Sequence, residues 1–253
     1  MHALIKRSLL APLLAPMLIT SACSSSTPGP LTIASGAYPA AYAELLQKYV
    51  TPTGVRYADW HSNPDDMKKI EEVANFYATT TPPADRNANL AWHLNAYNAW
   101  ILRNILAKYP TKGPLDGETL FFHGNRIVIS GKKTSFNDLE QKMIRPVFKE
   151  PRIHFALNCA SESCPPLNAQ PFDATSLDGD LNRLTRAFIN NNPQGVVPAG
   201  NEVKLSKIFQ WYADDFGGKN ALVTFINRYR QNPLPEKIKT EFLDYSWKLN
   251  SVK

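Results

Sequence analysis

The stretch from Pro151 to Leu167, PRIHFALNCASESCPPL, constrains this chain more than any other. It begins at a proline, continues as an apolar segment typical of a strand, and ends at the pair Pro165-Pro166. His154 lies inside the apolar segment, and Cys159 and Cys164 follow it. In a straight strand, residues 154 and 159 would lie on opposite faces, roughly 16 Å apart. We therefore predict a site here, formed by a strand whose chain turns after its apolar part.

The N-terminal residues have the layout of a secretory signal peptide. Lys6 and Arg7 form a short basic start, about a dozen mostly apolar residues follow, and small residues precede Cys23. The apolar run is too short to cross the ~30 Å hydrocarbon layer of a bilayer as a helix. Cys23 and the Ser/Pro-rich residues behind it resemble the lipidation motif of bacterial lipoproteins, although Thr20 stands where that motif usually has leucine.

These features divide the chain into three parts. We predict a signal peptide over residues 1–22, a lipidated Cys23 with a flexible tether over residues 23–37, and one domain over residues 38–253. The anchor predicts a cell-envelope protein that contacts the membrane through its acyl chains. Ser24 directly after the cysteine resembles the outer-membrane sorting signal of Gram-negative bacteria. We therefore expect the periplasmic face of that membrane.

The charge of the chain argues against nucleic acid as a partner. The full sequence has 28 Lys and Arg against 22 Asp and Glu, a formal net charge of +6. Loss of Lys6 and Arg7 with the leader leaves 26 against 22, or +4. This mildly basic balance, without a run of like charges, gives no indication of nucleic-acid binding.

Hydrophobic periodicity predicts a helix-rich domain. Apolar residues recur at helical spacing over residues 38–49, 63–78, 86–109, 135–148, 175–190 and 220–230. Alternating residues around 127–134 and 196–205 predict two short hairpins, and residues 242–247 predict a closing strand. We therefore expect a single helix-rich α+β domain with a small antiparallel sheet.

Two asparagines lie on the apolar stripe of the helix predicted over residues 86–109. Asn95 and Asn98 are three positions apart, so both amides point toward the core. A buried amide that lacks hydrogen-bond partners costs about 1–3 kcal/mol. The pair therefore either pins the helix to a loop or places one amide beside His154 and Cys159. His93 falls on another face and is expected at the surface or its boundary.

Four stretches together resemble a large family defined as a domain of unknown function, DUF547. They are AWHLNAYNAWILRNIL (91–106), ISGKKTSFNDLEQKMIRPVF (129–148), PRIHFALNCASESCPPL (151–167) and KLSKIFQWYADDFGG (204–218). They occur in the order of the family, and the resemblance spans roughly residues 38–232. After Glu140 the family often carries histidine, where this chain has Gln141. The resemblance implies no activity, so the chemistry has to be argued from the residues.

Three interpretations of the cluster stay open, and whether the protein is an enzyme stays open with them. The favoured one is a binding or scaffold domain for a small ligand or an envelope peptide, with a Cys159–Cys164 disulfide formed in an oxidising compartment. The second is a hydrolase or acyltransferase in which Cys159 is the nucleophile, His154 its base, and Glu140 or Asn98 the group that orients the base. The third is a metal held by His154, Cys159, Cys164 and Glu140, although their spacing matches no standard zinc pattern.

Three further residues are predicted to lie at the pocket. They are Asn95, Arg145 and Arg152. The two arginines either receive a carboxylate or another anion, or pair with Glu140 and Glu150. No motif for a cofactor is present, and we predict neither a cofactor nor a resident metal.

Overall fold

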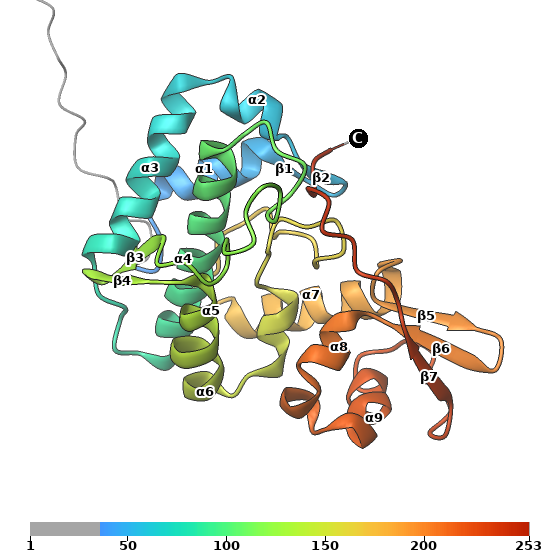
Figure 1. Ribbon diagram of the computed structural model, residues 1–253. Helices are drawn as coiled ribbons and strands as arrows, with labels where there is room; N and C mark the ends of the chain where they lie inside the picture. Colours follow the sequence, from blue (N-terminus) through green and yellow to red (C-terminus); the bar gives the residue numbers. More distant parts are fainter. Residues whose placement is uncertain (1–35, 253) are drawn as a thin grey trace, which may run out of the picture. The chain divides into compact units, whose positions relative to one another are not determined.

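The computed structural model describes residues 36–252, which form a helix-rich domain with small sheets (Figure 1). The α-helices are α1 (Ala40–Tyr49), α2 (Tyr57–His61), α3 (Pro64–Thr79), α4 (Arg86–Ala107), α5 (Phe136–Asp138), α6 (Arg145–Phe148), α7 (Leu177–Asn191), α8 (Lys207–Trp211) and α9 (Leu222–Asn227). A π-helical turn, η1 (Leu139–Ile144), joins α5 to α6, and the 3-10 turns are η2 (Pro151–Phe155), η3 (Ala213–Phe216) and η4 (Lys219–Ala221). The expected α+β class and the single helix-rich domain are confirmed. The predicted signal peptide, Cys23 and most of the tether lie outside the described residues.

Helix α4 forms the centre of the core because it is apolar on nearly every face. Every residue from Leu90 to Leu102 is buried, so the helix needs neighbours all round it. Asp85 caps its start by accepting hydrogen bonds from the backbone N–H groups of Asn87 and Ala88. The surface position expected for His93 is wrong, because the ring of Phe148 covers that side of the helix and the imidazole is buried.

The strands form three small sheets among residues 36–252. The bounds are β1 (Val50–Thr51) with β2 (Gly54–Val55), β3 (Ile127–Ile129) with β4 (Lys132–Thr134), and β5 (Val196–Ala199), β6 (Glu202–Leu205) and β7 (Lys239–Phe242). β6 pairs antiparallel with β5 and parallel with β7. The two predicted hairpins are confirmed as β3–β4 and β5–β6. The closing strand predicted over 242–247 is wrong in position, because β7 ends at Phe242 and the chain then leaves the sheet.

Residues 243–252, here called the C-terminal segment, cross from β7 to the β1–β2 hairpin (Figure 1). Their backbone hydrogen bonds go to β6 at one end, to β2 at the other end, and to loops in between. Glu162 N–H donates to the carbonyl of Lys248 at 2.7 Å, and Asn250 N–H donates to the carbonyl of Ala160 at 3.1 Å. At the far end, a Cβ on Gly54 would lie 2.6 Å from the carbonyl oxygen of Asn250. The segment is therefore closely fitted to the loop that carries the two cysteines.

Within residues 36–252, no helix combines the length and the apolar character that crossing a membrane requires.

Candidate functional site

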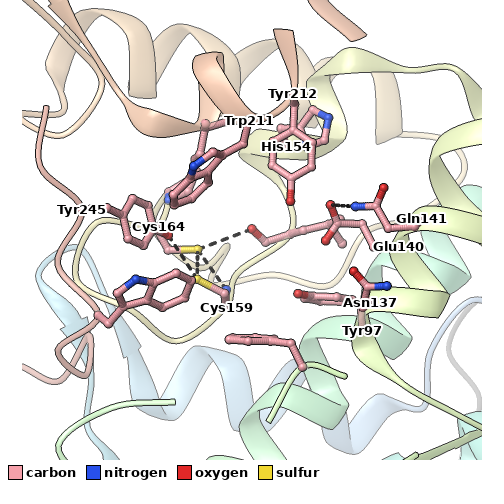
Figure 2. A pocket seen from close by; sticks show the side chains of 15 residues that line it. Tyr97, Asn137, Glu140, Gln141, His154, Cys159, Cys164, Trp211, Tyr212 and Tyr245 are labelled. Carbon is pink, nitrogen blue, oxygen red and sulfur yellow. Dashed lines mark hydrogen bonds between the residues drawn. The ribbon is translucent and has the colours of Figure 1, made fainter. Parts of the chain in front are cut away.

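One pocket collects the chemistry-bearing residues of the 151–167 stretch (Figure 2). Its cavity volume is about 140 Å³. Six aromatic side chains line it, namely Tyr97, Phe122, Trp211, Tyr212, Tyr245 and Trp247. The polar lining consists of Asn137, Glu140, Gln141 and His154, together with the two cysteines. Segments far apart in the sequence therefore meet at one cavity.

The segment before the cysteines is helical, so the predicted strand over 151–157 is wrong. Pro151 begins the 3-10 turn η2, and the side chain of Glu150 caps it by accepting from the backbone N–H of Arg152. The chain then turns sharply, with Ala160 in the left-handed region at a φ of 62°. As a result, His154 and Cys159 line the same cavity instead of pointing away from each other.

Residues 156–164, the cysteine loop, are held in place by hydrogen bonds to helix α4. Asn98 donates from Nδ2 to the carbonyl of Ala156 at 3.0 Å and accepts at Oδ1 from the N–H of Asn158 at 2.9 Å. Asn95 makes the same pair of bonds with the backbone of Phe172, each at 2.8 Å. Both amides pin α4 to loops, which was the first of the two alternatives. Neither lines the pocket, so a catalytic role for Asn98 and a binding role for Asn95 stay predictions.

The two thiols are in contact but not bonded. Cys159 and Cys164 are free cysteines, and their Sγ atoms are 2.8 Å apart, compared with ~2.05 Å in a disulfide. The disulfide considered from the sequence is therefore absent from the structure. Ser161 Oγ lies 3.1 Å and Tyr245 Oη 3.3 Å from Cys159 Sγ. Cys159 is thus surrounded by hydroxyl and thiol donors.

Hydrogen bonding and burial give the two thiols different pKa values. Burial raises the pKa of Cys159, but hydrogen bonds from Cys164, Ser161 and Tyr245 outweigh it and lower that pKa to about 7. Burial raises the pKa of Cys164 well above its ordinary value, and the charge on Cys159 adds to the effect. Cys159 is therefore the more acidic member of the pair.

His154 is oriented by a carboxylate that the sequence did not indicate. Its Nε2 lies 2.7 Å from Oδ2 of Asp215, and Arg145 holds the same carboxylate with two hydrogen bonds of 2.7 and 2.9 Å. The ring stacks on Tyr212 with centroids 3.9 Å apart. Burial raises the pKa of Asp215, but the hydrogen bonds from His154 and Arg145 hold it well below its usual range. The partner of His154 is therefore Asp215 rather than Glu140 or Asn98.

Glu140 lies on the π-helical turn η1, and its side chain faces the pocket (Figure 2). The residue is 8% exposed, and its carboxylate accepts from Gln141 Nε2 at 3.4 Å and hydrogen-bonds with the hydroxyl of Tyr212. Burial raises the pKa of Tyr97 and of Tyr212, and the charge on Glu140 raises both further. No basic side chain among residues 36–252 forms an ion pair with it.

The structure does not assemble the predicted metal alternative. Among the residues described, no group of three or more His, Cys, Asp or Glu could hold a metal ion. His154 is instead engaged by Asp215, and Cys159 by thiol and hydroxyl groups.

The two predicted anion-binding arginines are engaged in ion pairs. Arg145 pairs with Asp215, and Arg152 pairs with Glu150 and Asp178. The Glu150 partner was the alternative considered for Arg152. Neither arginine lines the pocket, and anion binding by them stays a prediction.

Residues 83–189 match the sequence model of a family described as protein of unknown function, DUF547. This match supports the DUF547 resemblance. No curated protein and no solved structure matches the chain.

The DUF547 match contains Asn98, Glu140, His154 and both cysteines, but several pocket residues lie after it. Sequence reasoning missed Asp215 and Tyr245 in particular. Asp215 is part of the KLSKIFQWYADDFGG stretch that carried the resemblance. Tyr245 and Trp247 alternate with Asp244 and Ser246 near the C-terminus, and such an aromatic pair is the signal that could have indicated a pocket wall.

Proposed function

We propose that the protein catalyses acyl transfer through Cys159, as a thiol-dependent hydrolase or acyltransferase. The observation that carries this proposal is the free Cys159 thiol at the aromatic pocket, with a pKa lowered to about 7. At neutral pH about half of such a thiol is thiolate, which is the nucleophilic form. A cysteine tied up in a disulfide could not act in this way.

The chemistry follows the general scheme of covalent catalysis. The Cys159 thiolate attacks the carbonyl carbon of an ester, thioester or amide, a C–S bond forms, and the leaving group departs with a proton from solvent. Water or another acceptor then attacks the acyl-cysteine, the C–S bond breaks, and the thiolate is regenerated.

His154 supplies the base for the second step of this proposal. In the neutral imidazole, Nε2 donates its proton to the ionised carboxylate of Asp215 in a hydrogen bond, so Nδ1 keeps its lone pair. Nδ1 takes the proton from the attacking water or acceptor and returns it to solvent. A histidine held by a carboxylate in this way retains one tautomer, as in other triads.

The test is a search for the acyl-enzyme. Purified protein is mixed with small p-nitrophenyl esters and thioesters, and the adduct is located by mass spectrometry of its peptides. We expect an acyl group on Cys159, no adduct in Cys159→Ala, and slower acylation in Cys164→Ala because a hydrogen bond to the thiolate is lost. Hydrolysis that continues unchanged in Cys159→Ala would contradict the proposal.

A second candidate, ligand binding without chemistry, is favoured by a different observation. The cavity wall is mainly aromatic, and no hydrogen bond joins His154 to Cys159 within residues 36–252. Such a pocket suits a small ligand or an envelope peptide. In that case the pocket binds ligand equally well in Cys159→Ala, and no acyl adduct forms with any ester.

We also propose that the protein is anchored in the cell envelope by lipid on Cys23, on the periplasmic face of the outer membrane. The support is the N-terminal sequence, with a basic start, an apolar run and a cysteine followed by Ser24. Bacterial cells that express the full chain should incorporate labelled palmitate into it, and Cys23→Ala should abolish this. Fractionation of the membranes then tests the location.

A further inference from the structure

The described residues contain two buried carboxylates, and they differ in their partners. Asp66 is 4% exposed and has Lys48 Nζ at 2.6 Å and Lys69 Nζ at 3.4 Å. Glu140 is 8% exposed, faces the pocket, and has no ion pair within residues 36–252. A buried charge is costly unless a counter-charge is close to it. The charge of Arg145 acts on Glu140 without an ion pair between them, so a cation bound in the pocket would be the first to pair with Glu140 directly.

The rest of the lining agrees with a positive occupant. No lysine or arginine is among the residues that line the cavity. The arginine closest in sequence to Glu140 in this region, Arg145, is already paired with Asp215. A carboxylate or phosphate entering the pocket would meet Glu140 and the Cys159 thiolate without any compensating cation.

The aromatic wall provides further attraction for a cation. Trp211, Tyr245 and Trp247 are in mutual contact, with ring centroids 4.8 to 6.2 Å apart, and the ring centroid of Phe122 lies 5.8 Å from that of Trp247. The electron-rich face of such rings attracts ammonium groups, and Trp is the strongest of them. Trp211 and Trp247 remain 48% and 36% exposed, so the wall is accessible from solvent.

The size of the cavity limits what enters. Its volume of about 140 Å³ is close to the ~150 Å³ of a cavity that accepts benzene. A single alkylammonium group fits this space, while the remainder of a larger molecule would lie outside. The pocket therefore selects one end of a ligand.

We infer that the pocket binds an alkylammonium group, so that the substrate carries a positively charged amine or quaternary ammonium close to its acyl carbon. The charge pairs with Glu140, and the methyl or methylene groups contact Trp211 and Trp247. The role as a substrate rests on the proposed acyl transfer at Cys159, whereas binding of the cation does not. The two parts can therefore fail separately.

Three probes of equal shape and different charge test the inference. Choline carries a quaternary ammonium, 3,3-dimethyl-1-butanol is its neutral isostere, and 3,3-dimethylbutanoate is an anion of similar size. Binding is measured by calorimetry and by the fluorescence of Trp211 and Trp247, at constant ionic strength. We expect choline to bind at least about tenfold more tightly than the neutral isostere, and the anion to bind more weakly still.

The variants identify the residues responsible. Glu140→Gln should weaken choline binding about tenfold and leave the isostere unchanged. Asp138→Asn is the matched control, because Asp138 precedes Glu140 on the same helical run and pairs with Lys142 at the surface. Trp247→Ala should also weaken choline binding, and this exposed position keeps the test decisive if Glu140→Gln folds poorly. Equal binding of choline and its isostere, no binding of choline, or unchanged binding in Glu140→Gln and Trp247→Ala would overturn the inference.

Cys159→Ala separates this inference from the proposed chemistry. We expect it to bind choline within about threefold of wild type, since the carboxylate and the rings remain. If choline binds as expected but no ester acylates Cys159, the cation site stands and the acyl transfer fails. If neutral esters acylate Cys159 and choline neither binds nor slows the reaction, the chemistry stands and the cation site fails.

Discussion

Two parts of the chain meet at the pocket and contribute to it in different ways. Residues 83–189, the DUF547 match, supply Cys159, His154 and Glu140, and the cysteine loop among them is held by buried hydrogen bonds such as those of Asn98. Residues after the match supply Asp215 and Tyr245, whose hydrogen bonds set the orientation or acidity of those groups. The first part therefore determines where the pocket residues lie, which we call positioning. The second part adjusts the orientation of His154 and the acidity of Cys159, which we call tuning.

The largest effect is expected where positioning is removed. Asn98→Ala leaves the carbonyl of Ala156 and the N–H of Asn158 without partners in the core. Each buried group that loses its partner costs about 1–3 kcal/mol, so the free energy of unfolding should fall by about 2–5 kcal/mol. Urea unfolding measures this. Asn104→Ala, a half-buried amide on the same helix whose oxygen accepts from the neighbouring Arg103, is the control and should change stability much less.

A loss below about 0.5 kcal/mol in Asn98→Ala would mean that the cysteine loop does not depend on α4. In that case the assignment of positioning to the matched region would be wrong. The C-terminal segment, which also bonds to this loop through Asn250, would then have to hold it.

The next effect concerns the bond that joins the two parts, between His154 and Asp215. Asp215 has a folded-state pKa below its ordinary value of 3.8, so it adds stability above that value. This stability is lost as the pH falls below about 4 and the carboxylate becomes protonated. Asp215→Asn should cost about 1–2 kcal/mol at pH 7 and show a smaller loss on acidification than wild type.

Unfolding in urea at pH 7 and at about pH 3 measures both quantities. Asp214→Asn is the matched control, because it precedes Asp215 on the same turn and forms no ion pair within the described residues. An equal difference in the free energy of unfolding between wild type and Asp215→Asn at both pH values would mean that His154 and Arg145 do not lower the pKa of Asp215. The link between the two parts would then be structural only.

The two parts also differed in how far the sequence predicted them. The histidine, the cysteines and Glu140 lie within 25 residues of one another, and helical periodicity placed Asn98 toward the core. Asp215 is 61 positions from His154, and Tyr245 is 86 positions from Cys159. Contacts over such distances depend on how elements pack, which periodicity does not report.

Local predictions failed for a related reason. Alternating apolar residues over 151–157 are compatible with a strand, but a proline can equally begin a 3-10 turn when a carboxylate such as Glu150 caps it. The tail over 242–247 has the composition of a strand, yet beyond Leu243, which still bonds to β6, its backbone leaves the sheet and bonds to the cysteine loop, which the sequence does not place beside it. The spacing of Cys159 and Cys164 allowed a disulfide, and only the three-dimensional arrangement shows two thiols that share hydrogen bonds instead.

The smallest effect isolates tuning from positioning. Tyr245→Phe removes one hydroxyl that bonds to Cys159 Sγ and keeps the ring that contacts Trp211 and Trp247. The pKa of Cys159 should rise from about 7 toward its ordinary value while stability changes little. A rise of about one unit lowers the thiolate fraction at pH 7 about fivefold, and alkylation by iodoacetamide should slow by the same factor. At pH 9.5 the two rates should converge, because both thiols are then mostly ionised.

The profile of alkylation rate against pH distinguishes this from altered access to the thiol. A change in access lowers the rate by the same factor at every pH, whereas a change in acidity moves the midpoint of the profile. Tyr229→Phe, at a tyrosine that lies against Phe225 away from the cysteines, should leave the midpoint in place. A midpoint that stays near 7 in Tyr245→Phe would assign the acidity of Cys159 to Cys164 and Ser161, both in the matched region. Residues of the matched region would then set the acidity of Cys159 as well as its position. The C-terminal segment would serve only as a wall of the pocket.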